Sequence, residues 1–254
     1  MLEQILSTDI YRFVLVVARI GSVVMLMPGL GAQYVLPQAR LFLGLSLSFL
    51  VLPLVTPLLP ALPRTTLGLF LTIVSEVTIG VFMGLMLQIL LVSIHSAATM
   101  ISFVSGFANS MVFDPVSEEQ SAVIVGFLGN IAVMAIFAAG LHHLVFQAAV
   151  DSYTLFRPGH PLLVGDLSQV ALKTLDQGFV LGAQMAAPFL VASVVFQVGL
   201  GVIARLMPQM NAFFVGLPAQ LLLGLALFMV VIPPMTIAFL NFFRDGIAGY
   251  VAPG

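Results

Sequence analysis

Six long apolar runs dominate the sequence, and polar residues gather in the segments between them. The runs cover roughly residues 10–30, 41–62, 67–94, 122–150, 178–206 and 212–243. Each is long enough to cross a hydrocarbon core of about 30 Å, which takes about 20 apolar residues in a helix. Only helices and closed barrels satisfy their backbone hydrogen bonds in lipid, and the runs lack the strict alternation of barrel strands. The pattern predicts an all-α membrane protein with about six long hydrophobic helices in kinked hairpins.

Composition strengthens this prediction and excludes several classes of function. Of the 254 residues, 61% are hydrophobic and only 7% are charged, whereas a soluble domain carries about 25% charged residues. The net charge is −2 with a single lysine, Lys173, so the clustered bases that nucleic-acid binding requires are missing. Because there is no cysteine, disulfides and thiolate metal sites are excluded. The N-terminal segment lacks a basic n-region, so we expect it to be retained rather than cleaved.

Prolines are expected to interrupt several of the runs. Pro188 lies in the fifth run, and Pro218 and the Pro233–Pro234 pair lie in the sixth. An interior proline removes a helix hydrogen bond and bends or breaks the helix. Segment 53–63 holds four prolines, which predicts a stiff, extended crossing. Broken helices that are apolar all round are typical of subunits buried in an assembly.

Two connections differ in character. Segment 97–121 is long, contains five serines together with Gly106 and Asn109, and carries acids but no base. Segment 151–176 is the most polar stretch of the chain, and Asp166 with Ser168 favours the start of a short helix ahead of the fifth run.

Glu76 is the one acidic residue in the middle of an apolar run. A charge at membrane depth is costly and marks a functional position or an ion pair between helices. The structural interpretation pairs Glu76 with Arg19 or Arg205. The functional one makes Glu76, together with Gln88, part of a midplane site in a small-solute or ion transporter.

Other candidate motifs are weak. The adjacent His142 and His143 point about 100° apart on a helix and lack the spacing of a metal site. We see no catalytic set and no phosphate-binding glycine loop, so neither a metal nor another cofactor is predicted and the chain is not expected to be an enzyme. Gly80 and Gly84 form a GxxxG pattern, which permits close helix approach.

Three stretches resemble the FliR family of flagellar and type III secretion export-gate proteins. The first is NSMVFDP at 109–115, followed by EEQS at 118–121. The second is GLHH at 140–143, followed by DSY at 151–153. The third and strongest is GLGVIARLMPQMNAFFVGLPAQ at 199–220, which departs from the usual family pattern at Ala212 and at 217–220. Their order and spacing, with the six apolar runs, extend the resemblance over nearly the whole chain.

The resemblance implies a structural pore subunit without catalytic chemistry. Such proteins assemble with FliP-like and FliQ-like subunits into a closed gate that passes unfolded proteins through the bacterial inner membrane. FlhB-like and FlhA-like proteins are neighbours in the flagellar basal body. Within a single membrane domain, residues 1–176 would correspond to a FliP-like portion and 177–254 to a FliQ-like hairpin.

The resemblance also assigns roles to two groups of residues. The loop from 106 to 121 would project into the closed pore as a plug. Its candidate residues are Gly106, Phe107, Asn109, Met111, Phe113, Asp114 and Pro115. A second group would form a helix break and packing site near the end of the fifth run. These residues are Arg205, Pro208, Gln209, Asn211 and Gly216.

Overall fold

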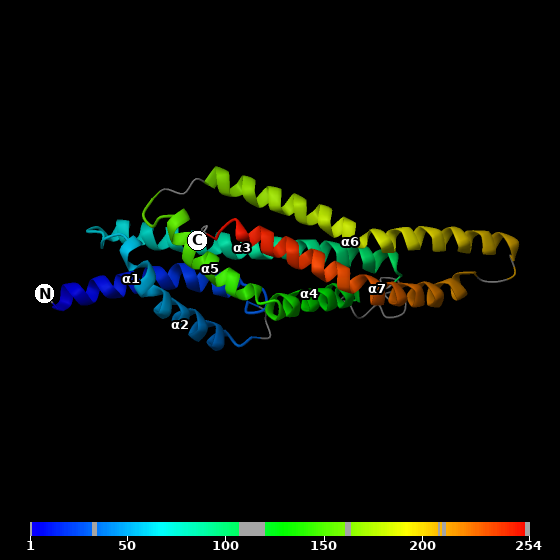
Figure 1. Ribbon diagram of the computed structural model, residues 1–254, viewed down its shortest axis with the longest axis horizontal. Helices are drawn as coiled ribbons and strands as arrows, with labels where there is room; N and C mark the ends of the chain where they lie inside the picture. The colour runs from blue at the N-terminus through cyan, green and yellow to red at the C-terminus, as the bar shows by residue number, and fades with distance from the viewer. Residues whose placement is uncertain are drawn as a thin grey trace. The chain divides into compact units, whose positions relative to one another are not determined.

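The computed structural model describes residues 2–31, 35–106, 120–160, 164–207, 209 and 212–251, and over these ranges it is helical without a strand. The α-helices are α1 (Leu2–Leu26), α2 (Pro37–Val55), α3 (Thr66–Val104), α4 (Gln120–Ala138), α5 (Leu141–Leu155), α6 (Val164–Leu206) and α7 (Ala212–Ala248) (Figure 1). A short 3-10 helix, η1 (Thr56–Leu58), follows α2. The prediction of an all-α membrane protein is confirmed.

The described helices give fewer membrane-length spans than the six predicted. Four are long and apolar enough: Pro37–Leu58, Thr66–Val104, Gly165–Leu206 and Gly216–Ala248. The α4–α5 pair makes a fifth if both helices form one broken span. Helix α1, which covers most of the first predicted run, is not among them. Any stretch of 18 residues within α1 contains three charged residues, Asp9, Arg12 and Arg19, and is therefore too polar for a span.

None of the prolines expected to interrupt a run ends its helix. Pro188 lies inside the continuous helix α6, and Pro218, Pro233 and Pro234 lie inside the continuous helix α7. Pro53 likewise lies inside α2, so the predicted extended crossing begins only after η1. A proline removes one hydrogen bond, but the remaining ladder of a long helix persists because lipid offers the backbone no other partners.

Several boundaries also differ from the predictions. Helix α3 continues to Val104, ten residues past the third predicted run and into the segment expected to be a connection. The fourth run is two helices, since α4 ends at Ala138 and α5 begins at Leu141 after Gly140, whose φ of 71° lies in the left-handed region that favours glycine. The short helix expected near Asp166 is continuous with α6. Ser168 does not cap it, because its hydroxyl donates to the carbonyl of Gly165 within the helix.

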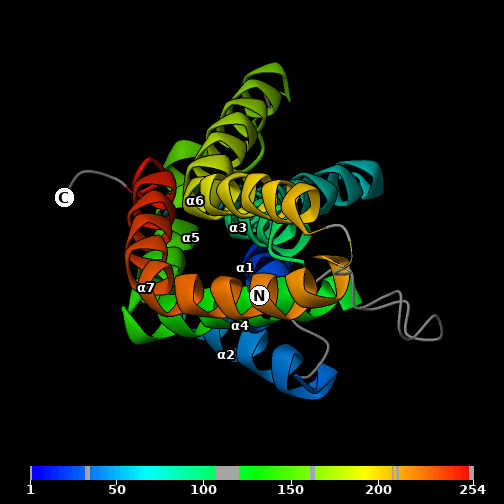
Figure 2. The ribbon, with the colours of Figure 1, turned by 90° about the vertical axis from the view of Figure 1, so that its right-hand side faces the viewer.

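The chain divides into two compact units. Unit 1 comprises residues 1–90, 136–174 and 243–254. There, α2 lies beside α1 in both views (Figure 1, Figure 2). Its core is mainly aliphatic and includes Leu15, Val16, Val23, Ile79, Leu90, Val145, Tyr153 and Phe243.

Unit 2 comprises residues 91–135 and 175–242. Within it, α6 and α7 form an antiparallel hairpin (Figure 1), and Phe189 of α6 packs against Phe228 of α7 with ring centroids 5.0 Å apart. A Cβ added to Gly216 would lie 2.7 Å from the side chain of Leu200. Gly216 therefore packs directly against the end of the Leu200 side chain.

Candidate functional site

A seam of residues spaced four apart runs along α3 and faces α1 in unit 1. We call Thr72, Glu76, Gly80, Gly84 and Gln88 the α3 seam. Residues four apart lie on one face of a helix and form the ridge that packs against a neighbour. Each member of the α3 seam meets α1, and both helices run in the same direction, because higher numbers on α3 meet higher numbers on α1.

The two ends of the α3 seam are polar contacts. At one end, the hydroxyl of Tyr11 lies 3.4 Å from the hydroxyl of Thr72. At the other, the side-chain amide of Gln88 donates to the carbonyl of Leu26 at 2.7 Å. Leu26 is the last residue of α1, so Gln88 supplies a donor to one of the carbonyls left unpaired at the helix end.

Glycines in the middle of the α3 seam bring the two helices together. A Cβ added to Gly80 would collide with the backbone carbonyl oxygen of Arg19 and lie 2.8 Å from Cβ of Ser22. A Cβ added to Gly84 would collide with Cβ of Leu26. The GxxxG pattern thus serves a contact within the chain.

Close approach places Arg19 of α1 against Glu76 of α3. Arg19 Nε donates to Glu76 Oε2 at 2.7 Å, and Nη2 donates to Oε1 at 3.0 Å. Arg19 is 0% exposed and Glu76 is 1% exposed. The bidentate geometry is the strong form of an arginine–carboxylate pair.

The C-terminal end of α5 completes the shell around Arg19. Nη1 donates to the backbone carbonyl of Ser152 at 3.1 Å and to its hydroxyl at 3.3 Å, and Nη2 donates to the carbonyl of Phe156 at 3.0 Å. The guanidinium carbon lies 4.1 Å from the ring centroid of Tyr153. Because α5 has no basic residue in its last turn, Arg19 provides the cation that favours a helix C-terminus.

This arrangement satisfies the guanidinium completely. The five hydrogen bonds match the five N–H groups of arginine. A buried charge persists only when it is paired and hydrogen-bonded. The site therefore ties three helices together, and the partner of Glu76 is Arg19 rather than Arg205. Sequence reasoning missed Ser152, Tyr153 and Phe156, although Ser152 and Tyr153 lie in one of the stretches that resemble a known family.

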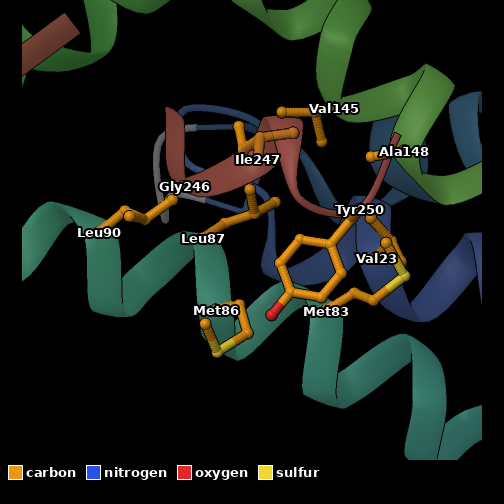
Figure 3. Close-up of a pocket in the computed structure, with 10 residues that line it drawn as sticks. All are labelled: Val23, Met83, Met86, Leu87, Leu90, Val145, Ala148, Gly246, Ile247 and Tyr250. Atoms are coloured by element: carbon orange, nitrogen blue, oxygen red, sulfur yellow. The ribbon is translucent and has the colours of Figure 1, made fainter. Parts of the chain in front are cut away.

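A small apolar cavity of about 20 Å³ lies beside the α3 seam within unit 1 (Figure 3). Met83, Met86 and Leu90 of α3 line one side, and Gly246 brings the end of α7 against Leu90. The hydroxyl of Tyr250 points toward Met83 and Met86 in Figure 3 and has no hydrogen-bond partner among the described residues. Burial raises the pKa of Tyr250, so its hydroxyl stays neutral.

Comparison with known proteins identifies the family. Residues 10–246 match the model of "Bacterial export proteins, family 1". The chain belongs to this export family. It is 33% identical over 237 residues to the flagellar biosynthetic protein FliR of Caulobacter vibrioides, covering 93% of this chain and 94% of the relative. It is also similar to the FliR proteins of Aquifex aeolicus, with 26% identity over 89% and 87% of the two chains, and of Escherichia coli, with 22% over 85% and 82%.

The predicted helix-break group of this export-family chain is only partly described. Arg205 lies exposed in the last turn of α6, Gln209 is exposed in the connection to α7, and Gly216 is buried in the α6–α7 contact. Pro208 and Asn211 lie outside the described residues.

The predicted plug loop lies outside the described residues except at its start. Gly106 follows the end of α3 with a φ of 78°. The side-chain amide of Gln220 on α7 donates to the carbonyl of Val104 at 2.8 Å, and a Cβ on Gly106 would lie 3.3 Å from Cδ of Gln220. Gln220 thus closes the end of α3 in unit 2. Phe107, Asn109, Met111, Phe113, Asp114 and Pro115 are not among the described residues.

The adjacent histidines of α5 pack among aromatic rings. The ring of His142 stacks on that of Phe137 with centroids 5.0 Å apart, and the centroids of the His142 and His143 rings are 4.0 Å apart. No group of three or more His, Cys, Asp or Glu side chains suited to a metal is found within the described ranges.

Proposed function

We propose that this chain is a structural pore subunit of a type III protein export gate in the bacterial inner membrane. It assembles with FliP-like and FliQ-like subunits, with FlhB-like and FlhA-like neighbours in the flagellar basal body. The gate passes unfolded flagellar or injectisome proteins. The family match over residues 10–246 carries this proposal, and the names of the relatives point to the flagellar system.

The distribution of apolar surface supports an assembled role. Of the best membrane-length window of α3, 56% is buried inside the chain, whereas the corresponding share is only 17% for α6 and for α7. One face of α6 is a stripe of exposed β-branched side chains at helical spacing: Val191, Val194, Val195, Val198 and Val202. Helices with so few internal contacts suit packing against other subunits.

Partner dependence is the first test. Expressed alone, the chain is expected to be unstable or aggregated, because most of the apolar surface of α6 and α7 is exposed over the described residues. Coexpressed with FliP-like and FliQ-like proteins from the same organism, it is expected to purify in detergent as one complex. Coexpression with two unrelated small membrane proteins controls for general effects on insertion. A stable, functional monomer in detergent contradicts the proposal.

The plug is the second test. Segment 107–113 carries two phenylalanines, a methionine and a valine beside Asn109 and Ser110, a composition that is both apolar and loose. Apolar constrictions block ions by dewetting. Deleting residues 107–113 is expected to leave assembly intact and to make the complex conduct ions, measured as conductance in planar bilayers or as growth inhibition. Replacing the segment with seven Gly and Ser residues separates its length from its apolar character. An assembled deletion complex as tight as the parent rules out the plug.

The transporter alternative loses its candidate site. A solute would need Glu76 and Gln88 free at membrane depth. Both oxygens of Glu76 accept from Arg19, and Gln88 donates to α1. We therefore propose no second function.

A further inference from the structure

An open groove runs along α1 within unit 1, with a volume of about 510 Å³. Its floor is made of small residues of α1, namely Ala18, Gly21 and Ser22, and its walls include Leu41 and Leu45 of α2 and Val77, Val81 and Leu85 of α3. The Ser22 hydroxyl is not available to a ligand as a donor, because it donates to the carbonyl of Ala18 at 2.6 Å. The groove therefore presents an almost wholly apolar lining.

One cation lines this groove. Arg40 is half-buried there, in the first turn of α2. Its Nε and Nη2 donate to the carbonyl of Val35 at 3.1 and 2.9 Å, and Nη1 donates to the carbonyl of Gly31 at 3.3 Å. These bonds use three of the five N–H groups of arginine, and both acceptors are neutral.

Arg40 has no anionic partner in the part of the chain that the structure describes. No carboxylate oxygen there lies within 4.0 Å of its guanidinium. The sequence contains no Asp or Glu between residues 10 and 75. This differs sharply from Arg19, which has a bidentate carboxylate. A half-buried guanidinium with two donors that have no partner among the described residues favours an anion from outside the chain.

The position of Arg40 fits the membrane. Both α2 and α3 are long and apolar enough to span it, and the outer side of α2 exposes Phe42, Phe49 and Leu50. Since Arg40 lies in the first turn of a helix of membrane-spanning length, we expect its guanidinium at the level where lipid headgroups meet the helix ends. The apolar part of the groove extends from there between the helices.

We propose that this groove binds one anionic phospholipid, with an acyl chain along α1 and the phosphate at Arg40. The chemistry matches at both ends, because the lining suits an acyl chain and a phosphodiester offers the oxygens that an arginine fork recognises. The groove volume of about 510 Å³ is far larger than a single water requires, so the groove can take part of an acyl chain. A partner helix would leave Arg40 uncompensated unless it carried an acid at that one level.

The test uses tryptophan fluorescence in bilayers. The chain contains no tryptophan, so Leu45→Trp introduces a single reporter in one wall, and Leu85→Trp a second reporter in another. Each full-length variant, with whatever subunits accompany it on purification, is reconstituted in phosphatidylcholine vesicles. Brominated phosphatidylglycerol or brominated phosphatidylcholine is then titrated in. Quenching is expected to favour phosphatidylglycerol about fivefold, the equivalent of about 1 kcal/mol for one arginine near the headgroups.

Arginine variants assign the preference to its cause. Arg40→Gln in the reporter background is expected to abolish the preference, so that the two brominated lipids quench about equally. Arg40→Lys keeps the positive charge and is expected to retain most of the preference for phosphatidylglycerol. A role of Arg40 limited to bonding the carbonyls of Val35 and Gly31 does not explain such a preference. Arg64→Gln, at an exposed arginine that does not line the groove, is the matched control and is expected to change nothing. Equal quenching by both lipids, or no quenching because protein fills the groove, overturns the proposal.

Discussion

Replacing Glu76 with leucine is expected to destabilise the protein by about 3–5 kcal/mol, because it leaves the charge of Arg19 buried without a counter-ion. Arg19→Met is expected to cost a similar amount. This change leaves the Glu76 carboxylate buried without a cation. It also removes the N–H groups that donate to the backbone carbonyls of Ser152 and Phe156. Each variant is compared with the parent by thermal unfolding in detergent and by its steady-state level in membranes.

The double variant Arg19→Met with Glu76→Leu separates a structural role from a functional one. Replacing both members of a buried ion pair with apolar side chains is often close to neutral. The double variant is therefore expected to recover most of the stability lost by either single change, together with motility in a strain lacking the native gene. A double variant that folds but does not support export would show that Glu76 acts in transport itself.

Arg244 provides the matched control for these charge changes. It is well exposed on α7, 3.5 Å from the neighbouring Asp245. Arg244→Leu is expected to change stability by no more than about 0.5 kcal/mol, because exposed pairs contribute little. Loss of stability equal to that of Arg19→Met would mean that the assay reports charge number rather than the buried pair.

Gly80→Ala is expected to cost about 1–3 kcal/mol, and Gly80→Val more. The added Cβ meets the backbone carbonyl oxygen of Arg19, which no rotamer change can move, so α1 and α3 must separate. Separation also lengthens the bonds between Arg19 and Glu76, which lies one turn before Gly80 on the same face. Thermal unfolding of the purified protein measures the loss.

Two glycines test whether the position or the residue type matters. Gly126 of α4 and Gly199 of α6 have no atom within 4 Å of an added Cβ, apart from their own chain neighbours and local helix backbone. Alanine is a better helix former than glycine, so Gly126→Ala and Gly199→Ala are expected to be neutral or slightly stabilising. If Gly80→Ala behaves like these two, close packing of α1 on α3 does not contribute to stability.

Much of the fold could be predicted from the sequence, because a lipid environment restricts the structures that an apolar chain can adopt. A chain with 7% charged residues cannot cover a water-facing surface, and lipid leaves the backbone little choice but the helix. Hydropathy does not report helix ends or continuity. Pro188 does not end α6, and Gly140 separates α4 from α5, because local hydrogen bonding and backbone dihedrals decide those points.

The candidate site, too, could be predicted only in part from the sequence. The sequence by itself determined that Glu76 needs a partner, since an acid in an apolar run is costly wherever it packs. It also indicated that Gly80 and Gly84 permit close approach. Only the tertiary structure decided that the partner is Arg19 and that the end of α5 completes the shell. Those contacts join residues 57 to 137 positions apart, and periodicity along a chain holds no information about which helix faces which.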